Sequence, residues 1–329
     1  MINFVSPLAD FPVGGIRNMF RFTDILNKNY IDSCMYQPGH LNFTPNYFVH
    51  QTKLREDELF DPSIDFIILA ESFVSRYGPI LGRNHLRYGI FVQNQYLIHN
   101  DYKNTGTYLD LQNYYENAEL IIVHTELVKD AIQFAFPTIP DDKFFHVIPS
   151  FARCIEKPKK TKTISYMSWK RLPAHVNYLM FLLDKYLPNN WTAVKIDDHS
   201  ENDYKKIIEE SVIFCSFSDL EGFGMAQVEA VMHENVTIGY TGEGSKAFWD
   251  SPCFIEIQPN DFQSYVKEIL AAIHRYENNM LYTPEYINVM NKLRARYSLE
   301  VEENVVLKLG KKIQEIMSIP NYHPICMLK

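Results

Sequence analysis

The chain has few cysteines, and their spacing is not that of a disulfide framework or a zinc site. In 329 residues the cysteines are Cys34, Cys154, Cys215, Cys253 and Cys326, which is an odd number without a Cys-x-x-Cys pair. Both kinds of site need paired or closely spaced cysteines. The pattern is typical of a protein in the reducing cytoplasm. Cys215, inside an apolar run, is predicted to be a small buried hydrophobic residue.

Long apolar runs are also absent. No stretch of about 18 apolar residues occurs, and the N-terminal MINFVSPLADF lacks a basic segment followed by an apolar one. We therefore expect neither a membrane span nor a signal peptide. The Lys-rich stretch CIEKPKKTKT (154–163) is either a basic patch for anionic lipid or a solvated linker. Without a flanking amphipathic helix the linker is favoured, which leaves peripheral membrane contact open.

Excess positive charge is missing too. The formal net charge is −8, and residues 1–150 contribute −6 of it. An acidic field of this kind gives no general attraction for a polyanion, so nucleic acid is not expected as a partner.

Several catalytic motifs are absent from the sequence. It contains no Asp-x-Asp of metal-dependent sugar-diphosphate sites, no Gly-x4-Gly-Lys-Ser/Thr loop, no Gly-x-Ser-x-Gly and no His-Glu-x-x-His. The acidic segment REDELFDP (55–62) is interpreted as a solvated loop in preference to a metal site. We expect no metal and no cofactor.

What the sequence does contain is an alternation of strand and helix patterns in two successive halves. Its length favours two domains. Predicted strands cover 2–8, 31–37, 65–71, 87–94, 118–126 and 144–151 in the first half, and 163–168, 192–197, 212–217 and 236–241 in the second. Predicted helices cover 16–28, 127–136, 176–187, 203–211, 224–234, 264–276 and 301–317. This alternation indicates an α/β protein with parallel sheets covered on both faces.

Glycine is scarce, yet it is concentrated in one region. Five of the 13 glycines lie between positions 222 and 244, and the first two stand in DLEGFGMAQVE (219–229). Gly222 and Gly224 would let the backbone approach a ligand and leave the amides of the next helix N-terminus available to it. Glu221 in the loop and Glu229, about 8 Å along the axis of the next helix, could bind hydroxyls at opposite ends of an extended ligand. On spacing alone, the favoured explanation is that Glu221 is a loop acid near a helix N-terminus and Glu229 a solvated helix residue.

EGFGMAQVE resembles the Glu-x7-Glu motif of retaining GT-B glycosyltransferases, in particular the family 4-like group. The segments VTIGYTGEGSKAFW, RYSLEVEENVVLKL and AELIIVHTELVKDAI…FFHVIPSF are similar to other parts of that family. The Pro-Asn-Gly stretch of the family is replaced here by Pro149-Ser150-Phe151. The resemblance implies two Rossmann-like domains facing each other across a cleft. It implies an acceptor domain (1–153), a linker (154–163), a nucleotide-sugar domain (164–310) and a C-terminal helix and tail (311–329).

The resemblance also implies roles for the motif. Glu229 would hold the ribose of a nucleotide sugar. Glu221 would face the transferred sugar, together with Gly222 and the backbone amides of Phe223, Gly224 and Met225.

A basic residue after the first strand of the second domain would hold the donor diphosphate. In SYMSWKRLPAH this role falls to Lys170 and Arg171, and the family's second lysine is absent from 174–178. A cation there would stabilise the charge that develops on the departing nucleoside diphosphate. Gly14 and Gly15 resemble the glycine loop of the first domain, beside the phosphates and the acceptor; a plain strand-to-helix turn is the alternative.

The acceptor side is less well defined. QNQYLIHND (93–101) follows a predicted strand where relatives carry a residue near the reacting sugar, so Gln93, Asn94 and His99 are the candidates. His124 and His146 lie in apolar runs and are interpreted as core or strand-end residues.

These observations favour a cytoplasmic retaining glycosyltransferase that transfers a sugar from a nucleotide-sugar donor to a hydroxyl acceptor, in glycan or polysaccharide biosynthesis. A GT-B sugar-nucleotide epimerase, a phosphorylase-like enzyme and a catalytically degenerate subunit that binds a partner transferase remain as alternatives.

Overall fold

The computed structural model describes residues 1–8, 13–40, 45, 47–151, 159–168, 171–197, 199–321, 323–324 and 326–328. The chain divides into two compact units. Unit 1 comprises Met1–Pro149 and Glu300–Lys329, and unit 2 comprises Ser150–Leu299. Lys170 and residues 154–158 of the predicted linker lie outside the described residues.

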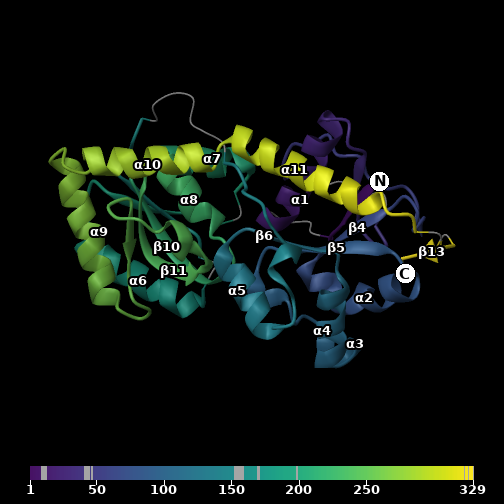
Figure 1. Ribbon diagram of the computed structural model, residues 1–329. Coiled ribbons are helices and arrows are strands. Elements are labelled where there is room, and N and C mark those ends of the chain that lie inside the picture. The colour runs from purple at the N-terminus through teal and green to yellow at the C-terminus, as the bar shows by residue number, and fades with distance from the viewer. Residues whose placement is uncertain are drawn as a thin grey trace. The chain divides into compact units, whose positions relative to one another are not determined.

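Unit 1 is built on a parallel sheet, shown with its helices in Figure 1. In spatial order its strands are β2 (Ser33–Tyr36), β1 (Ile2–Val5), β4 (Phe66–Ala70), β5 (Arg87–Val92), β6 (Leu120–Val123) and β7 (Phe144–His146). Its helices are α1 (Gly14–Lys28), α2 (Val74–Arg83), α3 (Tyr102–Thr105), α4 (Tyr108–Asn117), α5 (Glu126–Ala135) and α11 (Leu299–Met317). A short antiparallel pair joins β3 (Leu59–Phe60) to β13 (Cys326–Met327).

Alternate residues of the central strands enter two separate apolar layers. Along β4, Ile67 and Leu69 pack with α2, α4 and α5, whereas Phe66 and Ile68 pack with α1 and α11. Figure 1 shows α1 and α11 on one side of this sheet and α2 and α4 on the other. Burial on both faces explains why these strands are continuous apolar runs.

Unit 2 is a second parallel sheet with its own helices. Its strands, in spatial order, are β12 (Phe254–Glu256), β11 (Val236–Glu243), β10 (Ile213–Glu221), β8 (Thr163–Tyr166) and β9 (Thr192–Lys195). Its helices are α6 (Pro173–Tyr186), α7 (Glu201–Glu210), α8 (Met225–Met232), α9 (Phe262–Glu277) and α10 (Pro284–Arg296). The helix α6 packs beside α9, and α8 packs beside α10.

Helix starts in unit 2 follow capping side chains in the sequence. Ser200 caps α7, Asp261 caps α9 and Thr283 caps α10, each by accepting a hydrogen bond from a backbone N–H three residues later. These bonds satisfy donors that the first helical turn leaves without a partner.

The C-terminal helix departs from the predicted domain boundaries. The sequence-based boundary assigned residues up to 310 to the second domain, but from Glu300 onward the chain belongs to unit 1. The reason is apolar: Val306 and Leu309 of α11 are buried in the layer that contains Phe22 of α1. A partly buried ion pair of Arg21 and Glu302 adds to the contact.

Within the described part of the Lys-rich stretch, one lysine is bonded to a neighbouring helix. The Lys160 ammonium donates hydrogen bonds to the carbonyls of Glu209 (2.9 Å) and Ser211 (2.6 Å) at the end of α7. Residue 160 is therefore anchored on unit 2.

In the described part of the chain, no helix is both long and apolar enough to cross a membrane.

Candidate functional site

The motif lies at the carboxyl end of β10, where ligands of parallel α/β sheets collect. The strand is longer than predicted and includes Glu221 as its last residue, which pairs in register with Glu243 of β11. Glu229 is the fifth residue of α8. Both glutamates are half-buried.

Gly224 joins the strand to the helix in a conformation that other residues rarely adopt. It is the N-cap of α8 with φ = +81°. A Cβ at this position would lie 1.9 Å from Gln227 Oε1 and 2.2 Å from Ser245 Oγ. Both the backbone conformation and the close contact therefore require glycine.

The side-chain amide of Gln227 links the loop to the strands by hydrogen bonds. This side chain is buried, with 1% of its surface exposed. Its Nε2 donates to Ser216 Oγ (2.8 Å) and Ser218 Oγ (2.6 Å) on β10, and its Oε1 accepts from Ser245. Buried polar networks that are fully bonded fix one geometry. The sequence analysis missed Gln227, although a polar residue in an apolar helix segment is a signal for such a role.

Glu229 is oriented by a residue from another helix. Tyr204 on α7 donates its hydroxyl hydrogen to Glu229 Oε2 at 2.7 Å. A hydrogen bond to an ionised acceptor is stronger than one between neutral groups, so the contact favours a single carboxylate position. Nothing in the sequence spacing pointed to Tyr204.

The ring of Phe223 is buried in the core of unit 2. It packs against Phe151, Phe248 and Tyr297 at ring-centroid distances of 6.2, 5.3 and 5.5 Å. Only the backbone of Phe223 is therefore left for the ligand role that the resemblance implies.

Arg171 lies beside the carboxyl ends of β10 and β11. Its Nη1 donates to Asp219 Oδ1 at 2.9 Å, and its guanidinium carbon is 4.6 Å from the ring centroid of Tyr240. The arginine side chain is 13% exposed and that of Asp219 is 54% exposed. The structure thus brings Arg171 to the same edge of the sheet as Glu221.

In unit 1, two of the candidates meet at the carboxyl end of another sheet. Gly15, in the first turn of α1, accepts a hydrogen bond on its carbonyl from Gln93 Nε2 at 3.0 Å. A Cβ on Gly15 would lie 3.0 Å from that same nitrogen. Gly14 and Gly15 are thus the first two residues of α1, and Gly15 contacts the Gln93 amide.

A neutral histidine completes this network. Asn18 Nδ2 lies 3.3 Å from Gln93 Oε1 and 3.4 Å from His124 Nε2, while His124 Nδ1 lies 3.2 Å from the Val147 carbonyl. A carbonyl only accepts, so Nδ1 carries the proton and Nε2 accepts from Asn18. Burial lowers the pKa of His124 to about 4, which keeps the ring neutral near pH 7.

The other acceptor-side candidates are not part of that network. The Asn94 backbone N–H donates to Glu71 Oε1 at 3.0 Å, and its side chain caps the short 3-10 helix Gln95–Leu97. His99 is exposed in the turn that follows. His146 ends β7 and contacts Glu126, which agrees with its interpretation as a strand-end residue.

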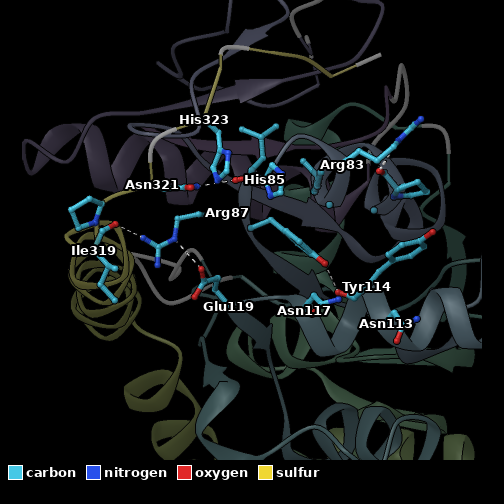
Figure 2. Close-up of a pocket in the computed structure, with 17 residues that line it drawn as sticks. Arg83, His85, Arg87, Asn113, Tyr114, Asn117, Glu119, Ile319, Asn321 and His323 are labelled. Carbon is cyan, nitrogen blue, oxygen red and sulfur yellow. Dashed lines mark hydrogen bonds and ion pairs between the residues drawn. The ribbon is translucent and has the colours of Figure 1, made fainter.

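Two cavities in the described part of the chain lie away from these residues. The larger, about 710 Å³, is in unit 1 at the N-terminal end of β5 (Figure 2). There Arg87 pairs with Glu119 at 2.9 Å, and the rings of His85 and His323 stack 4.0 Å apart. The smaller, about 350 Å³, is lined by residues at the start of β8 and the end of α9. Both are at the opposite sheet edge from the motifs.

The cysteines and metal-ligand residues offer no competing site within the described residues. Cys34, Cys215 and Cys253 are buried, and burial raises the pKa of the Cys215 thiol to about 12. No group of three or more histidine, cysteine, aspartate or glutamate side chains there is placed to hold a metal ion.

Comparison with solved structures identifies the fold. The chain superposes on Anabaena Alr3699/HepE, solved with UDP-glucose, with a TM-score of 0.65 and 12% identity over 96% of this chain and 99% of that one. It superposes equally well (TM-score 0.65, 10% identity, 95% and 99% covered) on the lipopolysaccharide outer core galactosyltransferase WaaB. The chain has the GT-B fold. The predicted fold class, α/β with two Rossmann-like domains, is confirmed.

At the sequence level the likeness is weaker. No protein-family model matches the chain. An alpha-1,6-glucosyltransferase of Actinobacillus pleuropneumoniae serotype 7 (strain AP76) is 23% identical over 195 residues. The match covers 58% of this chain, which spans about three fifths (59%) of the length of that relative.

Proposed function

We propose that the chain is a glycosyltransferase that transfers a sugar, with retention of configuration, from a nucleotide-sugar donor to a hydroxyl acceptor in cytoplasmic glycan or polysaccharide biosynthesis. The observation that carries the proposal is the rigid turn between β10 and α8, on which Gly224 and Gln227 hold Glu221 and Glu229 at the carboxyl edge of the sheet. The similarity to a glucosyltransferase, to a structure solved with UDP-glucose and to a galactosyltransferase supports the proposal.

In this proposal each residue at the edge of unit 2 has one task. Glu229, oriented by Tyr204, accepts hydrogen bonds from the donor ribose, and Glu221 accepts them from the transferred sugar. Arg171 stabilises the negative charge of the departing nucleoside diphosphate. Lys170, which adjoins it in sequence, is assigned the same task.

The chemistry needs no nucleophile from the protein. The bond between the anomeric carbon and the diphosphate oxygen breaks, and a bond to the acceptor oxygen forms on the same face of the sugar. The acceptor proton passes to the leaving phosphate. The protein contributes orientation and charge stabilisation, and we propose no metal or organic cofactor.

A thermal-shift screen against UDP-, GDP-, dTDP- and ADP-sugars tests the donor assignment. A ligand at 100 times its dissociation constant stabilises the folded state by about 2.7 kcal/mol, which raises Tm by a few degrees. We expect one class of nucleotide to do so for the natural chain.

The matched variants are Glu229→Ala and Glu268→Ala, which remove half-buried helical glutamates from α8 and α9. We expect the first to abolish the shift and lower sugar transfer about a hundredfold, and the second to leave both unchanged. Unchanged transfer in Glu229→Ala would contradict the proposal. A donor shift without any donor hydrolysis or transfer would favour the degenerate, partner-binding subunit instead.

A further inference from the structure

Glu71 is a buried carboxylic acid that the proposed reaction does not use. It follows β4 directly and only 5% of its surface is exposed. Ala70 pairs in register with Phe91 of β5, so Glu71 lies beside the end of that strand. Its Oε1 accepts a hydrogen bond from the backbone N–H of Asn94 at 3.0 Å.

This bond fixes the start of the acceptor-side loop. Asn94 in turn accepts on its side-chain oxygen from the backbone N–H of Tyr96 at 3.1 Å and on its carbonyl from that of Leu97 at 3.0 Å. The preceding residue is Gln93, whose amide reaches Gly15. A single carboxylate therefore anchors the turn from which the Gln93 side chain extends.

Keeping a charge at this place is unfavourable for folding. Burial raises the pKa of Glu71 to about 7, and the backbone N–H groups of Glu71, Asn94 and Gln93 oppose that rise. The titratable group facing it is the buried phenol of Tyr115 on α4, whose pKa the Glu71 charge raises further. Within the described residues, no lysine, arginine or histidine contributes to the Glu71 shift.

Resting on the glycosyltransferase function proposed above, we propose that Glu71 is a positioning residue for the acceptor: its carboxylate orders residues 93–95 so that the Gln93 side chain is oriented to bind the acceptor hydroxyl. A glutamine at 71 would fill the same space and still accept the Asn94 hydrogen bond, but more weakly because the charge is gone. Burying a carboxylic acid lowers the stability of the fold, and a functional role accounts for its presence at this position.

The variant Glu71→Gln tests the role through its pH profile. For the natural chain, kcat/KM for the acceptor should fall about tenfold as the pH drops from 8 to 6, because protonation removes the charge-assisted bond. Glu71→Gln should be about five- to tenfold slower at pH 8 and lose this dependence, whereas donor affinity stays unchanged. The control Glu126→Gln replaces an exposed acid after β6 and should keep the natural profile. A natural profile in Glu71→Gln would overturn the proposal.

Two further measurements do not depend on activity. Amide hydrogen exchange at residues 93–95 should be several times faster in Glu71→Gln at pH 8, and unaltered exchange would overturn the ordering role. Thermal unfolding should show Glu71→Gln with a higher Tm than the natural chain at pH 8 and the same Tm at pH 5. The sign follows because a raised acid pKa lowers stability as the pH rises from about 4.5 through 7.

The outcomes separate this inference from the proposed function. If the natural chain transfers no sugar, the proposed function fails, and so does the acceptor role of Glu71, whatever the exchange rates show. If the natural chain transfers sugar and Glu71→Gln does so with the same rates and pH profile, only the inference about Glu71 fails.

Discussion

The carboxyl edges of the two sheets differ in the charge of the groups they present. In unit 2, the exposed carboxylate of Asp219 pairs with the guanidinium of Arg171, and the half-buried Glu221 and Glu229 belong to the turn that follows β10. In unit 1 the corresponding edge presents the amides of its glutamine and asparagine residues and a neutral imidazole. Of the described acids at this edge, Glu71 is buried, whereas Glu126, which follows β6, is exposed and pairs with His146.

This difference fits the two substrates of the proposed sugar transfer. A nucleotide sugar carries a diphosphate whose charge grows as it leaves, and a ribose whose hydroxyls suit carboxylates. A hydroxyl acceptor is neutral and needs orientation more than charge. The two units also use glycine differently. Gly224 in unit 2 adopts a left-handed backbone conformation, whereas Gly15 in unit 1 leaves room for the Gln93 amide.

The largest effect on this contrast is expected from Gly224→Ala. The left-handed conformation costs an alanine about 1–2 kcal/mol, and its Cβ would displace the Gln227 amide and with it the first turn of α8. Because even a shift of about 1 Å at a reacting centre can lower a rate a hundredfold, we expect kcat/KM to fall about that much. Thermal melts and donor kinetics measure both effects.

Gly82→Ala is the matched control in unit 1. This glycine lies inside α2, and a Cβ there would meet no atom within 4 Å. We expect it to stabilise the fold by about 0.5–1 kcal/mol and to leave transfer unchanged. Equal behaviour of the two variants would show that the turn before α8 is not under conformational constraint.

Local patterns in the sequence predicted most of the strands, because a buried parallel strand is a short contiguous run of apolar residues. The predicted strands at 2–8 and 212–217 and the predicted helix at 16–28 correspond to β1, β10 and α1. The helices α2, α4 and α10 were not predicted; Pro79 lies inside α2 and argues against a helix there.

The site was accessible to sequence reasoning only where the motif is contiguous. Glu221 to Glu229 is a short segment, so strand and helix fix its geometry locally. The contacts of Tyr204 with Glu229 and of Glu71 with Asn94 join residues about twenty or more positions apart. Such pairs depend on how strands align in the sheet, which spacing alone does not encode. The docking of α11 on unit 1 belongs to the same class.

A smaller effect is expected from Tyr204→Phe, which sharpens the role of charge in unit 2. The variant removes the hydroxyl that donates to Glu229 and retains the ring. In the variant, water can replace the tyrosine hydroxyl as the hydrogen-bond donor to Glu229, so Tm should be nearly unchanged. The Glu229 carboxylate would no longer be held in one position, so we expect donor affinity to fall about fivefold. The control Tyr178→Phe changes an exposed tyrosine on α6 and should bind donor normally. Equal donor affinity in the two variants would remove Tyr204 from the site.

The smallest change in turnover is expected from His124→Gln in unit 1. At pH 7.5 the natural ring is already neutral, so a neutral amide that retains a hydrogen-bonding end should alter acceptor kinetics less than about twofold. Acid stability should change more, because charging His124 would place an Nε2 hydrogen against the Asn18 amide donor.

The sign of that acid effect follows from the lowered pKa. A histidine of pKa about 4 in the folded chain and about 6.5 when unfolded makes folding less favourable as the pH falls below 6.5. We therefore expect the natural chain to lose about 3 kcal/mol more than His124→Gln between pH 6.5 and 4, measured by denaturant unfolding. His274→Gln, an exposed histidine on α9, should follow the natural chain. If His124→Gln followed it as well, folding would not lower the pKa of His124, and burial would not be what keeps the imidazole of unit 1 neutral in the proposed acceptor edge.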